Sequence, residues 1–297
     1  SQVVVNSGGT VDFNGIDDAT YGYTISGSGV GGAGALVNNN ARAIGTGIAQ
    51  TSNIKLAADA SIGGTGDWAL LTNGYAATSL DLAGFTMTKV GSNTIRLVNT
   101  TATTGTIRVS AGALVLSNVV SNVSNVALTL DNVSGALFGT GNYAVTLASI
   151  SGGGATGGTV SLGTGSVTVG SSNASTVFAG AFTGSGSLTK QGNGTLTLSG
   201  SSSFSGGTTL SAGSLAVGSN TALGTGSVTV SSAGGIRSSD TNSRSLANNL
   251  TFSANATLGD AVANGALTFT GTAGLGASRT LTTASDVTFS GIVSGGA

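Results

Sequence analysis

Ten aspartates and nine lysines or arginines are the side chains from which this chain of 297 residues could build a reactive site, because histidine, cysteine and glutamate are absent. Nucleophilic triads, the common zinc sites and proton shuttles near neutral pH depend on the three missing types. Glycoside hydrolysis remains open, since it needs only two carboxyls about 5 to 10 Å apart. Carbohydrate chemistry is therefore the catalytic alternative that the composition leaves.

Two pairs of aspartates have spacings that could bring their carboxyls together on one coil, or on neighbouring coils, of a repeat structure. They are Asp59 with Asp67 and Asp240 with Asp260. We expect each of the four in a turn, and no basic residue is evident in register with either pair. We therefore predict no catalytic residue and a protein that is not an enzyme. A carbohydrate-binding or carbohydrate-cleaving β-helix is the alternative.

Two glycine-rich motifs are similar to ligand sites but are interpreted as turns. Gly27 to Gly32 has the G-x-G-x-x-G spacing of a dinucleotide site, yet no amphipathic helix follows to hold a phosphate. Gly63 to Asp67 resembles the calcium-binding repeat of toxin-type β-rolls, but the aspartate is one position early and the motif occurs once. We expect Asp67 in a turn and Trp68 packed at a coil corner, with no metal or cofactor bound.

Short strands are the elements that must position these residues, as Leu188 to Val217 shows best. Its sequence is LTKQGNGTLTLSGSSSFSGGTTLSAGSLAV. Thr195 to Ser199, Thr209 to Ser211 and Ser214 to Val217 alternate polar and apolar residues with the period of two that is typical of strands. Glycines and serines between these runs favour turns. The unit is therefore strand, turn, strand, turn.

A second copy of this unit lies 101 residues earlier, at Met87 to Leu116, and reads MTKVGSNTIRLVNTTATTGTIRVSAGALVL. Alignment without a gap pairs Lys89 with Lys190. In both copies the apolar pair of one strand returns 19 positions later, as Leu196 and Leu198 do at Leu215 and Val217. A repeat of about 20 residues built from short strands and glycine turns predicts a solenoid of stacked coils.

Three motifs in and just before the copy at Leu188 to Val217 resemble the passenger-associated transport repeat of autotransporter proteins, also called the autotransporter-associated β-strand repeat. They are Gly186-Ser187-Leu188-Thr189-Lys190, Gly194-Thr195-Leu196-Thr197-Leu198-Ser199-Gly200 and Phe204-Ser205-Gly206-Gly207-Thr208-Thr209, the last with Ala212-Gly213-Ser214-Leu215 following. This resemblance implies an extracellular or cell-surface location and type V secretion through an outer-membrane β-barrel. It also implies a right-handed coil, in line with the general crossover preference.

Composition excludes several other classes. The chain is 6% charged and 39% hydrophobic and has no proline, which distinguishes it from a disordered protein. A net charge of −1 provides no basic stripe for nucleic acid. No run approaches the ~20 apolar residues of a membrane helix, so we expect no membrane insertion by this segment.

The expected fold is all-β, a right-handed parallel β-helix of about 15 coils with almost no helix and a length of about 70 Å. Residues 1–297 should form one continuous solenoid segment of a longer chain, with repeat cassettes near 87–118 and 188–219. The chain starts in mid-coil and stops at Gly295 to Ala297, where another cassette would begin.

This fold and composition, together with the family resemblance, predict a structural, non-catalytic role as a surface-displayed or secreted bacterial fibre or passenger segment: a stalk, an adhesin body or an extracellular matrix filament. Expected partners are further coils or other copies in end-to-end contact, together with surface glycans or a receptor on a host or neighbouring cell. An open solenoid end presents a coil of unpaired backbone groups, which proteins seldom leave uncovered.

Overall fold

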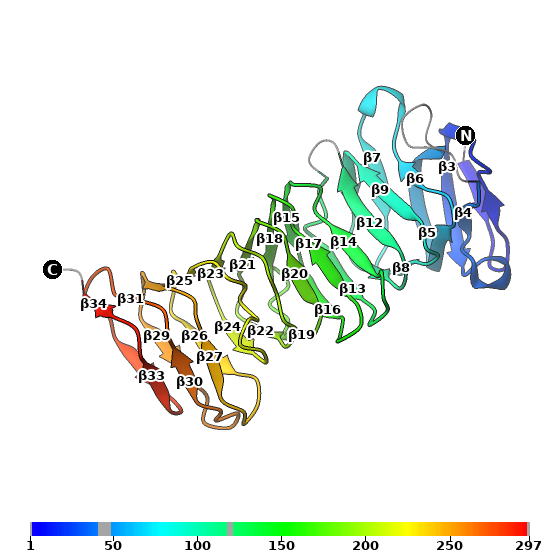
Figure 1. Cartoon of the computed structure of the whole chain (residues 1–297). Helices are drawn as coiled ribbons and strands as arrows, with labels where there is room; N and C mark the ends of the chain where they lie inside the picture. The colour runs from blue at the N-terminus through cyan, green and yellow to red at the C-terminus, as the bar shows by residue number, and fades with distance from the viewer. Residues whose placement is uncertain (1, 41–48, 118–120, 296–297) are drawn as a thin grey trace.

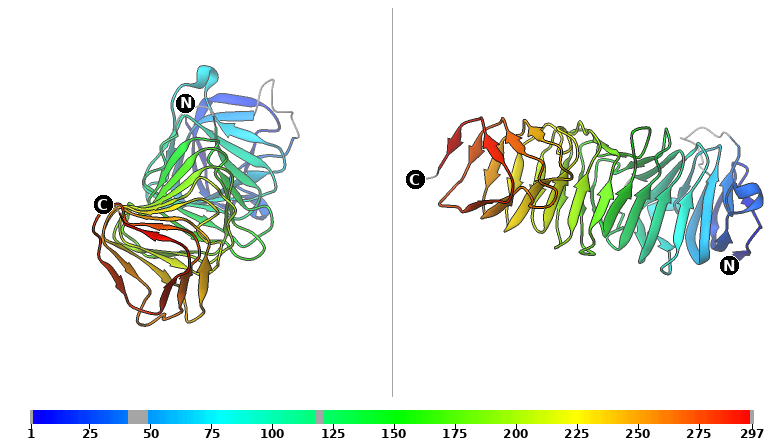
Figure 2. Two further views of the ribbon diagram at one scale, coloured as in Figure 1. Left: turned by 60° about the vertical axis from the view of Figure 1, so that its left-hand side comes forward. Right: turned by 90° about the horizontal axis from the view of Figure 1, so that it is seen from below.

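A computed structural model describes residues 2–40, 49–117 and 121–295, and these form an elongated parallel β-solenoid of about 13 turns (Figure 1). The N-terminal and C-terminal coils lie at opposite ends of the rod (Figure 2). Because strands of adjacent coils lie ~4.8 Å apart, 13 turns correspond to a rod about 60 Å long. The all-β parallel solenoid expected from the sequence is confirmed.

The strands of the described residues fall into three parallel sheets that run along the rod. The largest contains β1 (Gln2–Val5), β2 (Val11–Asp12), β3 (Asp17–Gly27), β4 (Leu36–Asn38), β5 (Ala49–Gly64), β6 (Trp68–Leu70), β7 (Thr78–Asp81), β8 (Thr86–Lys89), β9 (Thr94–Val98), β10 (Thr100–Ala102), β11 (Gly105–Val109), β12 (Ala113–Ser117), β13 (Val126–Leu130), β14 (Leu137–Gly139), β16 (Ser149–Gly152), β17 (Thr159–Ser161), β19 (Thr176–Phe178), β20 (Ala181–Thr183), β22 (Thr195–Leu198), β24 (Ser214–Val217), β26 (Gly234–Ser238), β29 (Ala256–Leu258) and β32 (Leu281–Thr283). The second contains β15 (Ala144–Leu147), β18 (Ser166–Val169), β21 (Ser187–Lys190), β23 (Thr208–Leu210), β25 (Val228–Val230), β28 (Leu250–Phe252), β31 (Ala273–Gly274) and β34 (Val293–Ser294). The third contains β27 (Arg244–Leu246), β30 (Leu267–Phe269) and β33 (Val287–Phe289).

The strand register confirms the repeat seen in the sequence. Leu196 of β22 pairs with Leu215 of β24, and Ile95 of β9 pairs with Leu114 of β12, each 19 positions apart. Each cassette therefore spans two successive coils of the solenoid, and the apolar pair of its first coil stacks on the equivalent pair of the next. Residue 118, at the end of the first cassette, lies outside the described residues.

The sequence predicted about 15 coils and the structure has about 13, because coils outside the cassettes are longer than the 19-residue returns within them, and those at the N-terminus are the longest. Thr24 pairs with Lys55, 31 positions later, and Lys55 pairs with Asp81, 26 positions later. These coils carry the long strands β3 and β5 and make the N-terminal part of the rod wider (Figure 1). Dividing the chain length by the coil length of the cassettes could not reveal these longer coils, since they lie outside the repeated motif.

Burial follows the alternation of polar and apolar residues. Leu196 and Leu198 are 1% and 2% exposed, and Leu210, Leu215 and Val217 are fully buried. The threonines between them, Thr195, Thr197 and Thr209, are only partly buried, as the period of two predicts. A single cluster of apolar side chains lines the inside of the described coils, because each strand turns one face toward the axis.

Helical structure in the described residues is limited to two single turns, η1 (Val30–Gly32) and η2 (Asn73–Tyr75). The first falls within the G-x-G-x-x-G motif, where Gly29, Gly31 and Gly32 have positive φ angles. This stretch is a tight turn, which confirms its interpretation from the sequence. No described helix has the length and hydrophobicity needed to traverse a bilayer.

Candidate functional site

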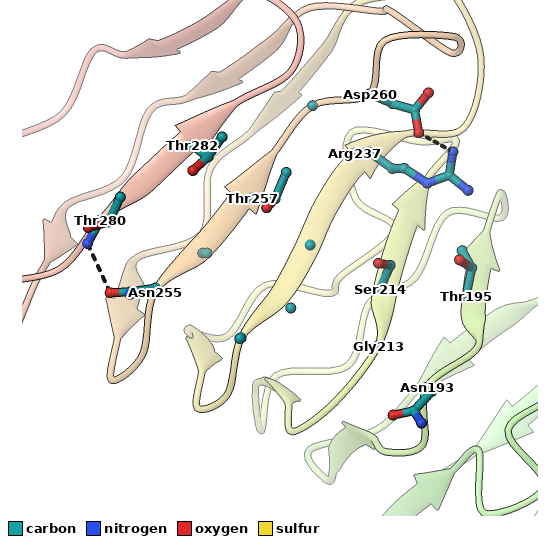
Figure 3. Close-up of a pocket in the computed structure, with 15 residues that line it drawn as sticks. Asn193, Thr195, Gly213, Ser214, Arg237, Asn255, Thr257, Asp260, Thr280 and Thr282 are labelled. Atoms are coloured by element: carbon teal, nitrogen blue, oxygen red, sulfur yellow. Dashed lines mark hydrogen bonds and ion pairs between the residues drawn. The ribbon is translucent and has the colours of Figure 1, made fainter.

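A shallow groove of about 760 Å³ crosses the outer face of the large sheet near the C-terminal end of the rod. It runs over five successive strands, β22, β24, β26, β29 and β32, which are neighbours in the sheet. Figure 3 shows the side chains that line it. Because it is a broad hollow lined by several polar side chains, we take this groove as the candidate site.

The middle of the groove is a row of small outward residues, one from each strand. In register from one strand to the next, these residues are Thr195, Ser214, Gly235, Thr257 and Thr282. The four hydroxyl side chains make no hydrogen bond with other described residues. Gly235 interrupts the row and leaves a gap between Ser214 and Thr257. The floor of the groove is therefore polar, uncharged and free to bind hydroxyl or amide groups of a ligand.

An ion pair closes one side of the groove. The Arg237 Nη1 lies 2.6 Å from Asp260 Oδ2, at the ends of β26 and β29 (Figure 3). The backbone N–H groups of Ala263 and Val262, together with Arg237, hold the pKa of Asp260 below its usual value. The carboxylate therefore stays ionised and neutralises the guanidinium, so this side of the groove carries polar donors without net charge.

Asparagine amides line the opposite side. Asn255 Oδ1 accepts a hydrogen bond of 2.9 Å from the backbone N–H of Thr280, which orients the amide, and Asn193 lies three strands away (Figure 3). No aromatic ring lines this groove. The arrangement can bind a polar, hydroxyl-rich molecule through hydrogen bonds, but it lacks the flat stacking platform that aromatic residues would provide.

The aspartate pairs weighed for catalysis have other partners in the structure. Arg237 bonds Asp260, and Arg244 Nη2 lies 2.8 Å from Asp240 Oδ2, so the prediction that no basic residue stands in register was wrong for this pair. The reason is that Asp260 follows the strand next to that of Arg237, whereas Arg244 is four residues after Asp240. Both carboxylates are engaged, which leaves neither as an evident acid or base.

The second aspartate pair stabilises the backbone of adjacent coils. Asp59 lies within β5 instead of in the expected turn, and its Oδ1 accepts the N–H of Thr86 at 2.8 Å. Asp67 does lie in a turn, and its Oδ1 accepts the N–H of Thr94 at 2.7 Å. In the described part of the chain, no three acidic residues converge as they would at a metal site. Each carboxylate thus ties one coil to the next.

Trp68 is packed in the core, as expected for a coil corner. Its side chain is fully buried, its Nε1 donates to the carbonyl of Gly63 at 3.0 Å, and its ring meets Phe13 edge to face at 5.2 Å. A sugar cannot reach this ring. Trp68 therefore stabilises the wide N-terminal coils and forms no part of a binding surface.

Two buried lysines are structural residues that the sequence analysis did not single out. Lys89 occupies a core position that Ile62 and Val109 fill in the coils before and after, and Lys190 stands likewise between Val169 and Leu210. Both are at most 1% exposed. The signal was present in the sequence, since both cassettes place lysine at an inward position of an alternating strand.

Each buried ammonium is held by three backbone carbonyls at a coil corner. Lys89 Nζ donates to Val90, Gly91 and Ala111 at 2.9, 2.9 and 3.1 Å. Lys190 makes the equivalent three bonds in the second cassette. Burial lowers the pKa of Lys89 to about 8, although the negative charge of Asp67 raises this pKa by a smaller amount. Burial also lowers the pKa of Lys190. The lysines satisfy inward carbonyls that the turn would otherwise leave unpaired.

The glycine turn beside the second lysine explains why the cassette ends its strand there. Gly192 has a φ of 71°, and a Cβ at this position would lie 1.9 Å from the carbonyl oxygen of Gly170 in the previous coil. Only glycine fits such a close approach with a positive φ. The Lys-x-Gly sequence of both cassettes therefore builds one corner of the coil.

Comparison with known families identifies the same two segments. Residues 87–116 and 188–217 match the family described as passenger-associated-transport-repeat. The chain thus carries two such repeats, as expected for an autotransporter passenger with β-solenoid repeats. No curated protein and no solved structure matches the chain.

Proposed function

We propose that this chain is a structural, non-catalytic segment of an autotransporter passenger. A passenger-associated repeat within a β-solenoid fits an autotransporter passenger, and this repeat family implies a secreted or cell-surface protein. One observation supports the role of a stalk, adhesin body or extracellular filament. Both repeats form coils of a single parallel register, so the repeat extends a rod.

The polar outer surface and the bonding between coils support a role as a rigid, solvent-exposed spacer. Among the residues that the structure describes, ion pairs are few and join residues of the same or adjacent coils, such as Arg108 with Asp131 at 2.8 Å. Along the second sheet, Thr168, Thr189 and Thr209 stack in register, one for each coil. Backbone hydrogen bonds join each coil to its neighbours, which stiffens the rod along its whole length.

End-to-end contact with further coils or with another copy is part of this proposal. In the last described coil, Val293 is 50% exposed, whereas Ala273, its partner in the preceding coil, is buried. Another coil stacked on this surface would bury the Val293 side chain and pair the backbone of its strand. Electron microscopy of the full-length protein should show long thin rods or filaments, and short particles capped at both ends of this segment would contradict the contact.

Surface display is testable with a tag in an exposed loop. Val262 lies between β29 and β30 and is 88% exposed, so an epitope inserted there should not disturb the coils. In the source bacterium, an antibody against this epitope should label intact cells or the medium. Labelling only after lysis would contradict a secreted or surface role.

The non-catalytic part of the proposal needs its own measurement. The purified chain should release no reducing ends from bacterial or host polysaccharides over long incubation, because its candidate carboxylates are bound by arginines or backbone amides. Release that disappears in Asp260→Asn would instead show a glycoside hydrolase and overturn this part.

A further inference from the structure

Gly235 is a strand residue whose backbone does not require glycine. It points outward from β26, and its φ is not among the positive values in the chain. A Cβ at Gly235 would lie 3.1 Å from the Ser214 side-chain oxygen, a tight contact that rotation of the serine hydroxyl relieves, and 3.4 Å from the Thr257 carbonyl oxygen and 3.8 Å from the Ser214 Cβ. The adjacent Gly234 is different, since its Cβ would lie 2.7 Å from a backbone carbonyl. Glycine inside a strand lowers stability, so Gly235 has a cost that the fold does not explain.

The missing side chain opens the centre of the groove. In the same row, Ser214 and Thr257 stand on either side of Gly235. A threonine at Gly235 would complete a continuous row of hydroxyl residues and fill the hollow. Because the row crosses five strands spaced ~4.8 Å apart, the groove extends for about 19 Å along the rod. Its length suits an oligosaccharide of a few units lying along the axis.

We propose that this groove binds a neutral glycan, a ligand site that goes beyond the structural role proposed above. The free hydroxyls of Thr195, Ser214 and Thr257 can donate to and accept from sugar hydroxyls. Arg237 retains N–H donors beyond the one that it gives to Asp260, and charge-assisted bonds from such a fixed pair suit adjacent sugar hydroxyls. Glycine at position 235 allows the ring of the sugar to approach the sheet.

The chemistry of the lining separates this ligand from other classes. Asp260 neutralises Arg237, so the groove offers no net positive charge to a nucleic acid or an anionic sugar. Its only apolar side chains are those of alanines, which give little surface to an apolar ligand. A peptide cannot add here as a strand, because β26 is already paired on both sides, with β24 and β29.

Binding can be tested with the purified chain and four neutral probes: cellotetraose, maltotetraose, chitotetraose and mannotetraose. Saturation-transfer NMR and calorimetry should detect at least one of them. Gly235→Thr, which fills the groove, should weaken that binding at least tenfold while leaving the melting temperature unchanged or higher. Arg237→Met, which removes the donors but keeps the side-chain stem, should also weaken it at least tenfold.

Gly22→Thr is the matched control. Gly22 is also an outward strand glycine without positive φ, its Cβ would meet Asn53 at an ordinary 3.5 Å, and it lies at the other end of the rod. This variant should bind the sugar as the unaltered chain does. Absence of binding by all four probes, equal binding by Gly235→Thr, or tighter binding of tetragalacturonate would overturn the proposal. Rods seen by microscopy would still support the structural role, so the two can fail separately.

Discussion

Replacing Lys89 by methionine should remove a pH dependence from the stability of the solenoid. Burial lowers the pKa of Lys89 to about 8, whereas an unfolded lysine titrates near ~10.4. Between these pH values the unfolded chain binds a proton that the folded chain has released, so the free energy of unfolding rises with pH. At ~1.36 kcal/mol for each pKa unit, the full rise is about 3 kcal/mol.

At pH 7 the same substitution should lower the free energy of unfolding. Methionine fills a similar volume but leaves the carbonyls of Val90, Gly91 and Ala111 without the donor that Lys89 provides. Each buried unpaired carbonyl costs ~1–3 kcal/mol. Removing the ammonium also removes the desolvation cost of a buried charge, which offsets part of this loss. We expect a net loss of about 2 kcal/mol for Lys89→Met at pH 7.

Urea unfolding followed by circular dichroism from pH 7 to 10.5 measures both effects. The stability of the unaltered chain should rise through this range, and that of Lys89→Met should rise less, with the remainder due to Lys190. Lys55→Met is the control, because the Lys55 side chain is 56% exposed and its replacement leaves Lys89 and the three carbonyls that it bonds in place. An equal slope in Lys89→Met would refute the assignment to Lys89. If the free energy of unfolding of the unaltered chain does not change with pH, the hydrogen bonds from the three carbonyls stabilise the ammonium as much as burial destabilises it.

Three other substitutions test the register, the surface ion pairs and the N-terminal core. Leu198→Asp places an unpaired charge among buried side chains and should lower the free energy of unfolding by roughly 3–5 kcal/mol. Thr197→Asp, on the outer face of the same strand, should be nearly neutral. Equal melting temperatures for the two variants would refute the assignment of inward and outward side chains. Arg108→Ala should cost no more than about 1 kcal/mol, because its pair with Asp131 is half exposed, and a larger loss in urea unfolding would contradict the view of these pairs as minor. Trp68→Ala should cost about 3–5 kcal/mol because the ring is fully buried, and a melting curve like that of the unaltered chain would place the ring outside the core.

The sequence by itself determined the strand pattern, the class of fold and the stacking of successive coils within each cassette. Alternation of threonine and leucine in Thr195 to Leu198 decides which face of a strand is buried, and this depends only on the period of two. The 19-residue return from Leu196 to Leu215 decides which strand lies next, because equivalent side chains stack in a repeat structure. Both properties can be recognised in the linear sequence before the coils are placed in space.

Contacts between coils were decided by the tertiary structure alone. The pairing of Arg237 with Asp260 depends on the length of the turns between β26 and β29, and the extra coil length between Thr24 and Lys55 depends on residues outside the cassettes. No periodicity measures these lengths. The groove and the buried position of Lys89 have the same origin, since each depends on which residues of adjacent coils meet in register, and this alignment exists only after the coils have stacked.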